Sequence, residues 1–347
     1  MHTKIWRMAP QELDIKMLQE AAQLLKEGEV IGFPTETVYG LGADALNPEG
    51  VKKIFAAKGR PMDNPLIVHV CSQNQVEGLV ESIPPEAVRL MKKFWPGPLT
   101  LVLPKAGIIP DIITAGLETV AVRMPSHPVA LRLIELAGIP VAAPSANKSG
   151  KPSPTTAEHV WQDLQGKIAG IIDGGRAGVG VESTVLDLSC GTPTILRPGG
   201  ITREQLEAEI GQVNLDTNLN DINAAPRSPG MKYTHYSPDA DLIIVQGNDY
   251  EIKEKLSKIL LDREPESVGV MISQEIHKLM DKDFPVDVKL KIMGTRQNME
   301  EITSNLFDTL RWFDHQNVSV IYAESFPQDH IGAALMNRLY KAAGGKI

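Results

Sequence analysis

The sequence predicts an α/β protein of two domains, and three observations support this. Strand-like and helix-like segments are interleaved along nearly all of the 347 residues. Their order is irregular in the first part and regular in the last, which predicts a twisted mixed sheet followed by a smaller parallel sheet. Between them, residues 211–238 lack an apolar period and are rich in Asn, Asp, Pro and Ser. We therefore expect domains at 1–210 and 239–347, joined by a linker at 211–238.

The elements of the first domain follow from the spacing of apolar residues and from Gly and Pro at the segment ends. Helices are predicted at 15–28, 48–59, 85–97, 127–138 and in a segment ending at residue 210. Strands are predicted within 29–46, 65–70, 98–104, 119–128, 139–154, 167–175, 183–189 and 192–199. Because these do not alternate strictly, the pattern differs from that of a doubly wound sheet.

The second domain alternates regularly between strand and helix. Strands are predicted at 241–247, 267–273, 286–294 and 318–325. Helices are predicted at 250–262, 275–281, 299–315 and 330–343. Four strand–helix units of this length are typical of a small parallel, Rossmann-like sheet.

Charge and cysteine content exclude several classes of protein. Residues 1–203 contain 20 Lys and Arg and 20 Asp and Glu, whereas residues 204–347 contain 15 and 23, so the net charge of −8 belongs to the second part. The two cysteines, Cys71 and Cys190, show no spacing for a disulfide framework or a thiolate zinc site. No apolar run reaches the length of a membrane span, and the first ten residues lack the apolar core of a signal peptide. We expect a cytoplasmic protein without a membrane part.

The familiar nucleotide and metal motifs are absent from the sequence. There is no P-loop, and residues 40–45 fit the dinucleotide fingerprint only loosely, without the acidic residue that contacts ribose. The eight His include no pair with zinc-protease spacing, so a zinc ion held by the protein is not expected.

Cationic and polar side chains stand instead at the ends of predicted strands and helices. They are Lys58, Arg60, Arg123, Ser145, Asn147 and Arg197. Any one of them alone would be interpreted as a solvated surface residue or a turn former. His69, on its apolar strand, would be interpreted as a core histidine. Together they supply the cations, hydroxyls and amides that bind a phosphate or carboxylate. The set predicts an anion-binding site.

Lys58-Gly-Arg60, followed far downstream by Ser145-x-Asn147, resembles the KxR…SxN signature of the YrdC-like domain family. Other blocks of the chain are similar to this family in order and spacing: 33–45, 60–70, 94–103, 120–128 and 180–199. The likeness covers residues 10–210 almost continuously. Residues 228–238, "SPGMKYTHYSP", and the second domain resemble the long, two-domain form of the threonylcarbamoyl-AMP synthases.

The resemblance implies a YrdC-like twisted mixed sheet with a wide, concave, positively charged surface. It also implies a reaction in which L-threonine, bicarbonate or CO₂, and ATP give threonylcarbamoyl-AMP and pyrophosphate. Mg²⁺ would be held mainly by the ATP phosphates. A downstream threonylcarbamoyl-transferase complex would then pass the group to an adenosine beside the tRNA anticodon, and weak binding of RNA is compatible with this role.

The resemblance also implies roles for individual residues, with Lys58 and Arg60 as the catalytic pair. The expected ATP and AMP contacts are Lys58, Arg60, Asn64, Thr119, Ser145, Asn147, Ser153, Arg197, His235 and Tyr236. The expected threonine contacts are Thr37, His69, Arg123, Ala143 and Ser183, with Thr35 as an alternate. Arg123 would clamp the threonine carboxylate, and His235 and Tyr236 would belong to a lid. Because Lys58 and Arg60 are expected in a loop, their removal should leave the fold intact.

Two other classes of function remain open at this point. An RNA-binding module could use the same basic surface, although the aromatic content is only 5% and the cations do not form runs. Another carbamoyl-adenylate enzyme could use the same domain. The YrdC-like carbamoyltransferases that mature hydrogenase carry an acylphosphatase-like domain and Cys-rich zinc fingers, which this sequence lacks. The sequence does not indicate a ligand for the second domain or an oligomeric state.

Overall fold

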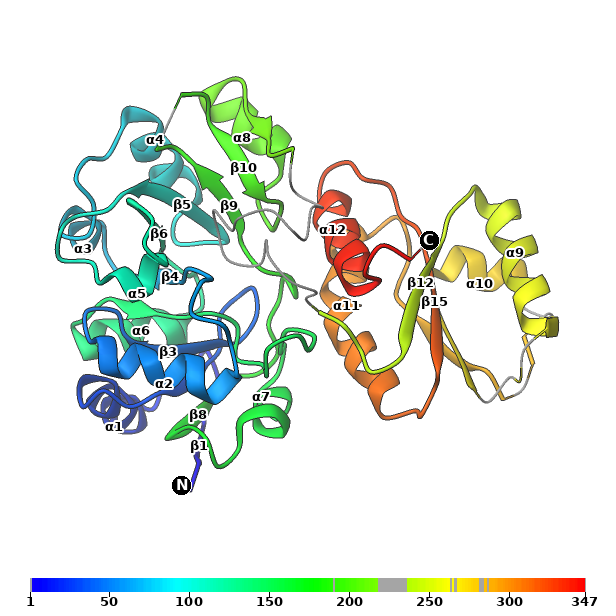
Figure 1. Ribbon diagram of the computed structural model, residues 1–347, viewed down its shortest axis with the longest axis horizontal. Helices are drawn as coiled ribbons and strands as arrows, with labels where there is room; N and C mark the ends of the chain where they lie inside the picture. Colours follow the sequence, from blue (N-terminus) through cyan, green and yellow to red (C-terminus); the bar gives the residue numbers. More distant parts are fainter. Residues whose placement is uncertain are drawn as a thin grey trace. The chain divides into compact units, whose positions relative to one another are not determined.

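The computed structural model describes residues 2–189, 191–217, 236–262, 264, 267–280, 284–285 and 287–346. These residues form two compact units, which are described separately (Figure 1). The first unit contains the described residues up to 149 and from 153 to 217. The second contains the described residues from 236 onward and, in addition, residues 150–152. A three-residue segment of the N-terminal half therefore belongs to the second unit.

The first unit is built on one sheet, in which the described residues form eleven strands. Their order is β1-β8-β2-β3-β7-β4-β6-β5-β9-β10-β11. The strands are β1 (Lys4–Arg7), β2 (Ile31–Phe33), β3 (Gly40–Asp44), β4 (Ile67–His69), β5 (Leu99–Pro104), β6 (Thr119–Arg123), β7 (Val141–Ala142), β8 (Gly170–Asp173), β9 (Thr184–Asp187), β10 (Thr194–Arg197) and β11 (Asn214–Leu215). Parallel pairs such as β4 with β6 stand beside antiparallel pairs such as β5 with β6. The predicted mixed sheet is confirmed.

Helices cover this sheet, and their ends follow the capping signals in the sequence. They are α1 (Ile15–Lys26), α2 (Pro48–Lys58), α3 (Gln73–Glu77), α4 (Pro85–Phe94), α5 (Asp111–Thr114), α6 (Pro128–Ala137), α7 (Ala157–Leu164) and α8 (Arg203–Ile210). Helix α2 is an example of capping at both ends. Asn47 caps its first turn through the N–H groups of Glu49 and Gly50, and Gly59 ends it in the left-handed conformation with φ of 62°. The helix therefore delivers Lys58 to the start of the turn that leads into β4.

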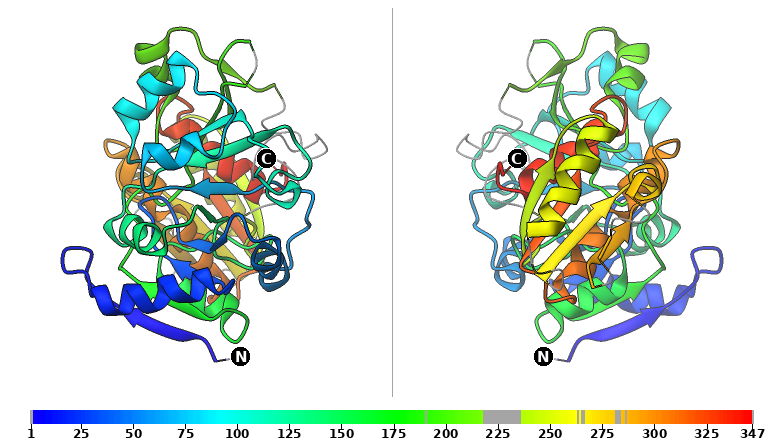
Figure 2. Two further views of the ribbon diagram at one scale, coloured as in Figure 1. Left: turned by 90° about the vertical axis from the view of Figure 1, so that its left-hand side faces the viewer. Right: turned by 90° about the vertical axis from the view of Figure 1, so that its right-hand side faces the viewer.

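Strand β1 was not predicted from the sequence. It is an edge strand with a single deeply buried side chain, Trp6, so it shows no alternating pattern. Its neighbour is α1, and the carboxylate of Glu20 on that helix accepts hydrogen bonds from Lys4 at 2.5 Å and from the Trp6 indole at 3.0 Å. Figure 2 shows this strand and helix side by side.

The second unit is a small parallel sheet of the order β12-β15-β13-β14. Its described strands are β12 (Asp241–Val245), β13 (Val268–Ile272), β14 (Lys289–Ile292) and β15 (Val320–Glu324). Its described helices are α9 (Asp249–Asp262), α10 (Gln274–Met280), α11 (Met299–Asp314) and α12 (Gly332–Ala342). Helix α9 packs with α10, and α11 packs with α12. The predicted Rossmann-like alternation is confirmed.

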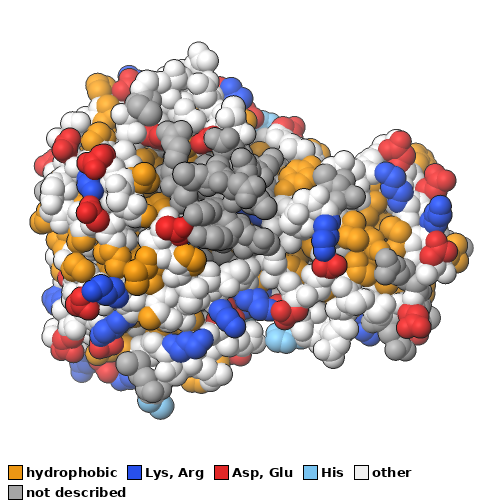
Figure 3. Space-filling model, viewed as in Figure 1, with side chains coloured by type: hydrophobic (Ala, Val, Ile, Leu, Met, Phe, Trp, Pro, Cys, Tyr) orange, Lys and Arg blue, Asp and Glu red, His pale blue; other side chains and the backbone are white. Residues whose placement is uncertain are grey.

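The surface drawn in Figure 3 carries charges of both signs. On the face shown, Lys and Arg side chains of the first unit stand among acidic and apolar ones. Cations mixed in this way differ from the continuous basic stripes that follow a nucleic-acid backbone. Within the part of the chain that the structure describes, no helix is both long enough and apolar enough to cross a membrane.

Candidate active site

One face of the central strands collects several of the predicted site residues. Five buried apolar side chains from the neighbouring strands β4, β6, β5, β9 and β10 form a cluster on this face: Ile67, Ala121, Val102, Val185 and Leu196. Because side chains alternate along a strand, residues two positions away share this face. His69, Thr119, Arg123 and Ser183 stand at that spacing from the cluster. The sheet therefore places residues that are far apart in the sequence on one face, with His69 beside Arg123 at one end of β6 and Thr119 at its other end.

Lys58 joins the two parts of the predicted signature. Its ammonium group donates to the carbonyl oxygens of Ser145 at 2.5 Å and Asn147 at 2.6 Å, and lies 3.3 Å from Asn147 Oδ1. In return, the N–H of Ser149 donates to the Lys58 carbonyl at 2.8 Å. The cation thus fixes the loop that follows β7 and also places its charge beside the side chains of that loop.

The expectation that Lys58 lies in a loop is wrong, and with it the reason for expecting that its removal leaves the fold intact. Lys58 is the last residue of α2, and only 2% of it is exposed. Loss of its ammonium group would leave the carbonyl groups of Ser145 and Asn147 without this donor, which destabilises a buried site by about 1–3 kcal/mol per group. Lys58 therefore contributes to stability as well as to the charge of the site.

The side chains of Ser145 and Asn147 form a compact polar pair. Ser145 Oγ donates to Asn147 Oδ1 at 2.5 Å, and Asn147 Nδ2 donates to the Lys148 carbonyl at 2.9 Å. The backbone of this loop is held by strand β3 and the residue before it, since Ser145 pairs with Gly40 and the N–H of Ala146 donates to Tyr39. The hydroxyl and amide groups are thus preorganised next to the Lys58 cation.

Arg60 folds back over the turn that separates α2 from β4. Its Nη2 atom donates to the carbonyl oxygens of Pro65 at 3.2 Å and Asn64 at 3.4 Å. Asn64 is 1% exposed, and its Oδ1 atom finds no hydrogen-bond partner among the described residues. A buried amide oxygen without a partner is costly, so this position is suited to a donor on a ligand.

Arg123 lies at the end of β6, directly opposite His69 at the end of β4. It is 4% exposed. Its guanidinium group donates to Glu36 Oε1 at 2.6 Å, to Thr37 Oγ1 at 2.9 Å and to the Gly97 carbonyl at 3.3 Å. The group therefore already holds a carboxylate, the chemical group that an amino acid would present to it.

Thr35 and Thr37 have different tasks in this arrangement. Thr35 donates its hydroxyl proton to the Val38 carbonyl at 2.6 Å and so closes the turn after β2. The two hydroxyl oxygens are 2.8 Å apart, so the proton between them comes from Thr37. Thr37 in turn accepts from Arg123. Thr37, rather than its alternate Thr35, therefore faces the guanidinium group.

A second cation, Arg197, is tied to the predicted threonine-side residue Ser183. Its Nε and Nη2 atoms donate to the Ser183 carbonyl at 3.1 and 3.0 Å, and Nη2 lies 3.2 Å from Ser183 Oγ. Thr100 Oγ1 is 2.7 Å from the same hydroxyl. One residue earlier, Glu182 accepts from Ser153 Oγ at 2.5 Å. Arg197 therefore holds Ser183, and Ser153 holds the neighbouring residue Glu182.

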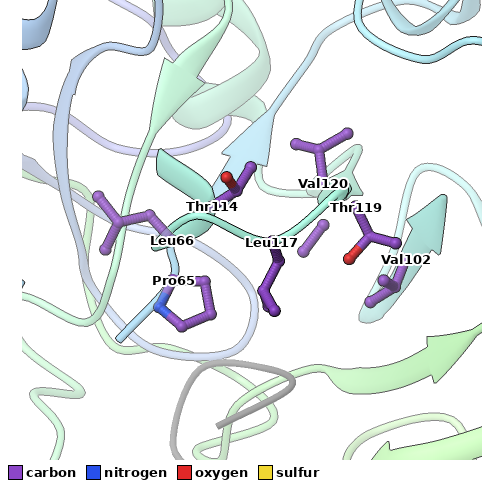
Figure 4. A pocket seen from close by; sticks show the side chains of 8 residues that line it. Pro65, Leu66, Val102, Thr114, Leu117, Thr119 and Val120 are labelled. Atoms are coloured by element: carbon purple, nitrogen blue, oxygen red, sulfur yellow. The ribbon is translucent and has the colours of Figure 1, made fainter. Parts of the chain in front are cut away.

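Thr119 and Ala143 lie in the same unit. Thr119 lines a narrow cleft together with Pro65, Leu66, Val102, Thr114, Leu117, Val120 and Ala121. Figure 4 shows Pro65 and Leu66 on one side of this cleft and Thr119 and Val102 on the other. Ala143 is buried, and its N–H donates to the Ile67 carbonyl at 2.9 Å.

His69 is a buried neutral imidazole. Burial, reinforced by the nearby charge of Arg123, lowers the pKa of His69 to about 3. Its ring meets Phe33 edge to face at 6.3 Å, and its Nδ1 atom finds no partner among the described residues. At neutral pH this side chain can therefore exchange hydrogen bonds with a substrate without adding charge.

The lowered pKa of His69 predicts a pH dependence of stability. Below its ordinary pKa of 6.5, the unfolded chain binds a proton at His69 that the folded chain excludes until about pH 3. The stabilisation is therefore complete above pH 6.5 and is lost as the pH falls through this window, by up to about 1.4 kcal/mol per pH unit. Denaturant unfolding of wild type and His69→Gln across the window measures it. His69→Gln should flatten the decline, and replacement of the exposed His315 should not. An equal slope in wild type and His69→Gln would contradict the assignment.

Sequence reasoning missed two acidic residues of the site, Glu36 and Glu182. Glu36 pairs with Arg123, and Glu182 with Ser153. Each directly precedes a residue that was predicted, Thr37 in one case and Ser183 in the other. An acid beside a candidate hydroxyl residue is the signal that would have found them.

The remaining predicted residues belong to the linker. Tyr236 is in the second unit, 5% exposed, with its ring 5.1 Å from that of Phe307. His235 lies outside the described residues. Among the residues that are described, no group of three or more His, Cys, Asp or Glu side chains is placed to hold a metal ion.

Comparison with known proteins finds two matching families that together span most of the chain. A Sua5/YciO/YrdC family model described as "Telomere recombination" matches residues 23–199. A model of the "Threonylcarbamoyl-AMP synthase, C-terminal domain" matches residues 201–344.

Relatives match over nearly the full length. The threonylcarbamoyl-AMP synthase of Bacillus subtilis is 53% identical over 331 residues, which cover 95% of this chain and 94% of that protein. The synthase of Pyrococcus abyssi is 49% identical, with 94% of each chain covered. The crystal structure of P. abyssi Sua5 complexed with L-threonine superposes with a TM-score of 0.92 at 46% identity, covering 100% of this chain and 99% of that one.

Proposed function

This chain belongs to the family of threonylcarbamoyl-AMP synthases, and we propose that it joins L-threonine, bicarbonate or CO₂, and ATP into threonylcarbamoyl-AMP and pyrophosphate. It is thus an adenylyl-transferring enzyme. The observation that carries the proposed site is the contact of the Lys58 ammonium group with the loop of Ser145 and Asn147. This contact places a cation, a hydroxyl and an amide together, as binding of a phosphate requires.

The proposed reaction needs no nucleophile from the protein. The neutral amine of threonine attacks CO₂ and loses a proton to solvent, and one oxygen of the resulting N-carboxylate attacks the α-phosphorus of ATP. A new P–O bond forms, the bond from the α-phosphorus to the bridging oxygen breaks, and pyrophosphate leaves with the electron pair. The protein accelerates this step by positioning the reactants and neutralising phosphate charge. Lys58 and Arg60 are the cations proposed for that task.

Mg²⁺ fits the site as a companion of ATP. Phosphate oxygens and water are its preferred ligands. The only protein oxygen that we assign to its surroundings is Asn64 Oδ1, which is buried and finds no partner among the described residues. When bound, the ion would offset negative charge on the phosphates.

We assign the threonine side of the site to the face that carries Arg123. Its guanidinium fork suits a carboxylate, and the hydroxyl groups of Thr37 and Ser183 are polar partners for the substrate. His69 adds a neutral ring. The nucleotide side is assigned to Lys58 and to the loop after β7 that carries Ser145 and Asn147. The further contacts are Arg60, Asn64, Thr119, Ser153 and Arg197. On this assignment Glu36 must release or share Arg123 when threonine binds, because its carboxylate uses the same guanidinium group.

We further propose that residues 228–238 close over the nucleotide as a lid that excludes water from the adenylate. Of this segment, only residues 236–238 belong to the part of the chain that the structure describes. The physical reason is compositional, since Tyr233 and Tyr236 are flat groups that are entropically inexpensive to order over a ring. Tyr236 would have to leave its contact with Phe307 to cover the nucleotide. We expect proteolytic cleavage within 211–238 in the free protein and protection when ATP and threonine are both present. Cleavage at the same rate with and without the ligands would contradict the lid.

The cytoplasm is the proposed location, and a tRNA-modifying transferase is the proposed consumer of the product. Because the product is a mixed anhydride, it is activated for transfer and also prone to hydrolysis, so a consumer must act soon after its release. Transfer of a labelled threonylcarbamoyl group to tRNA in a coupled assay would test this extension.

The function itself is tested by release of pyrophosphate from ATP and bicarbonate with and without threonine. We expect release to depend on threonine, with serine as the best competitor and valine ineffective. A site that hydrogen-bonds a substrate hydroxyl rejects the isostere that lacks it by up to about 10⁴-fold, more than it rejects the loss of a methyl group. Release that is independent of threonine, or equal with valine, would contradict the proposal.

A further inference from the structure

One face of helix α11 contacts two other segments of the second unit, Tyr236 and residues 150–152. Phe307, Arg311 and Asp314 are spaced by four and three residues, so they share a face of this helix. Phe307 packs against the ring of Tyr236. Arg311 and Asp314 contact residues 150–152, the segment of the N-terminal half that belongs to the second unit. We call residues 150–152 the hook.

Polar contacts with described residues of the second unit hold the hook. The ammonium group of Lys151 lies 2.5 Å from Asp239 Oδ1 and 3.3 Å from Asp314 Oδ2. Arg311 Nη2 donates to the Pro152 carbonyl at 2.6 Å. The N–H of Ser237 donates to the Gly150 carbonyl at 2.9 Å. Main chain and side chain of the hook are therefore both fixed.

Asp239 and Asp314 share the interaction with Lys151, and they differ in exposure. The side chain of Asp314 is 14% exposed and that of Asp239 is 72% exposed, so water screens Asp239 far more. Asp314 is also oriented by a second bond, because its Oδ1 atom accepts from the Asp239 N–H at 2.7 Å. Burial opposes the charge of Lys151, but the two carboxylates outweigh it and raise the pKa of Lys151.

The hook lies between two residues of the proposed nucleotide site. Asn147 stands three residues before Gly150, and Ser153 follows Pro152 directly. Gly150 turns the chain with φ of 90°, the ring of Pro152 fixes its own φ, and only two residues separate Asn147 from the hook. A shift of the hook must therefore be absorbed by the loop of Asn147 or by Ser153.

We propose that Lys151 is a positioning residue of the nucleotide site. By anchoring the hook to α11, it sets the loop that carries Ser145, Asn147 and Ser153 in the geometry that receives the phosphates of ATP. The inference rests on the proposed function for the identity of the nucleotide. On this proposal the second unit contributes to ATP binding through the hook, without binding a ligand itself.

The test compares Lys151→Ala with a matched control, Lys346→Ala. Lys346 belongs to the same unit and pairs with Asp241 at 2.7 Å, but both side chains are more than half exposed. The dissociation constant of ATP is measured by calorimetry, the KM values of ATP and threonine by pyrophosphate release, and stability by thermal unfolding.

For Lys151→Ala we expect an ATP dissociation constant and KM raised about threefold to tenfold, as suits a partly buried ion pair, with the threonine KM within about twofold. Lys151→Arg should restore ATP binding at least in part, because the arginine side chain also reaches a carboxylate. Asp314→Asn should weaken ATP binding, and in combination with Lys151→Ala the two effects should be less than additive. Lys346→Ala should bind ATP as the wild type does.

Two results would overturn the inference. One is normal ATP binding by Lys151→Ala. The other is an equal rise of the ATP and threonine KM values together with a lower melting temperature, which a merely structural role produces. Failure of the proposed function is seen separately, as wild-type protein that releases no threonine-dependent pyrophosphate. Even if the proposed function fails, the calorimetric comparison of ATP binding by wild type and Lys151→Ala still tests whether the hook positions the nucleotide site.

Discussion

Lys58→Met is expected to lower kcat/KM for ATP by about a hundredfold to a thousandfold, the range found when one group that stabilises transition-state charge is removed. Methionine keeps the buried, unbranched part of the side chain and removes only the ammonium group. That group is the donor to Ser145 and Asn147, so the loop also loses its charge-assisted hydrogen bonds. Steady-state pyrophosphate release measures the effect.

The same change should lower the melting temperature by several degrees, because two buried carbonyl groups lose this donor. Lys52→Ala is the matched control. Lys52 stands on the same helix, is about half exposed, and pairs with Glu49 at 2.6 Å. The control should change neither the rate nor the melting temperature. A Lys58→Met variant with near-normal kcat/KM would remove Lys58 from the catalytic role.

Arg123→Ala is expected to raise the KM for threonine about a hundredfold while the KM for ATP changes little. Truncation of one partner of a buried, hydrogen-bonded charge pair costs about 2–5 kcal/mol, much of it from the charge that is left unpaired. Arg123→Lys keeps the charge but loses the planar fork, so we expect an intermediate loss. Arg132→Ala, which removes an arginine paired with Glu135 at 2.7 Å on α6, is the matched control.

Loss of Arg123 also leaves the largely buried carboxylate of Glu36 with the Ser126 N–H but without its cation, which destabilises the protein. The double variant Arg123→Ala with Glu36→Gln separates the two effects. It should recover much of the stability and none of the threonine affinity. If the double variant also bound threonine normally, Arg123 would be a structural residue and the assignment of the carboxylate clamp would be wrong.

The sequence predicts those parts of the fold that its own local pattern encodes. Strands such as β13 and β15 are short, fully buried apolar runs between amphipathic helices, so both the elements and their parallel arrangement could be read. Strand β1 could not be predicted, because an edge strand with one buried residue shows no alternation of apolar and polar side chains. Strand β7 is limited to Val141–Ala142, where the apolar run had predicted a longer strand, since Pro140 and Pro144 bound it on both sides.

The site divides in the same way. Lys58, Arg123 and Asn147 are recognisable because their types and spacing resemble a family signature. Their partners are not, because a contact such as that of Lys151 with Asp314 joins residues 163 positions apart and depends on the folded chain. The burial of Lys58 was hidden for this reason too, since nothing in the local pattern shows that the last residue of a helix is covered by a distant loop. Local pattern identifies the reactive groups, and only tertiary structure identifies what orients them.

The most direct test of the proposed reaction follows carbon from bicarbonate into the nucleotide product. The protein is incubated with ATP, threonine and ¹³C-labelled bicarbonate, the reaction is quenched early, and the products are separated and weighed by mass spectrometry. We predict a nucleotide with the mass of threonylcarbamoyl-AMP that carries the label, forms only when threonine is present, and matches pyrophosphate in amount. A product without the label, or pyrophosphate released with AMP alone from the first time point, would contradict the proposed function.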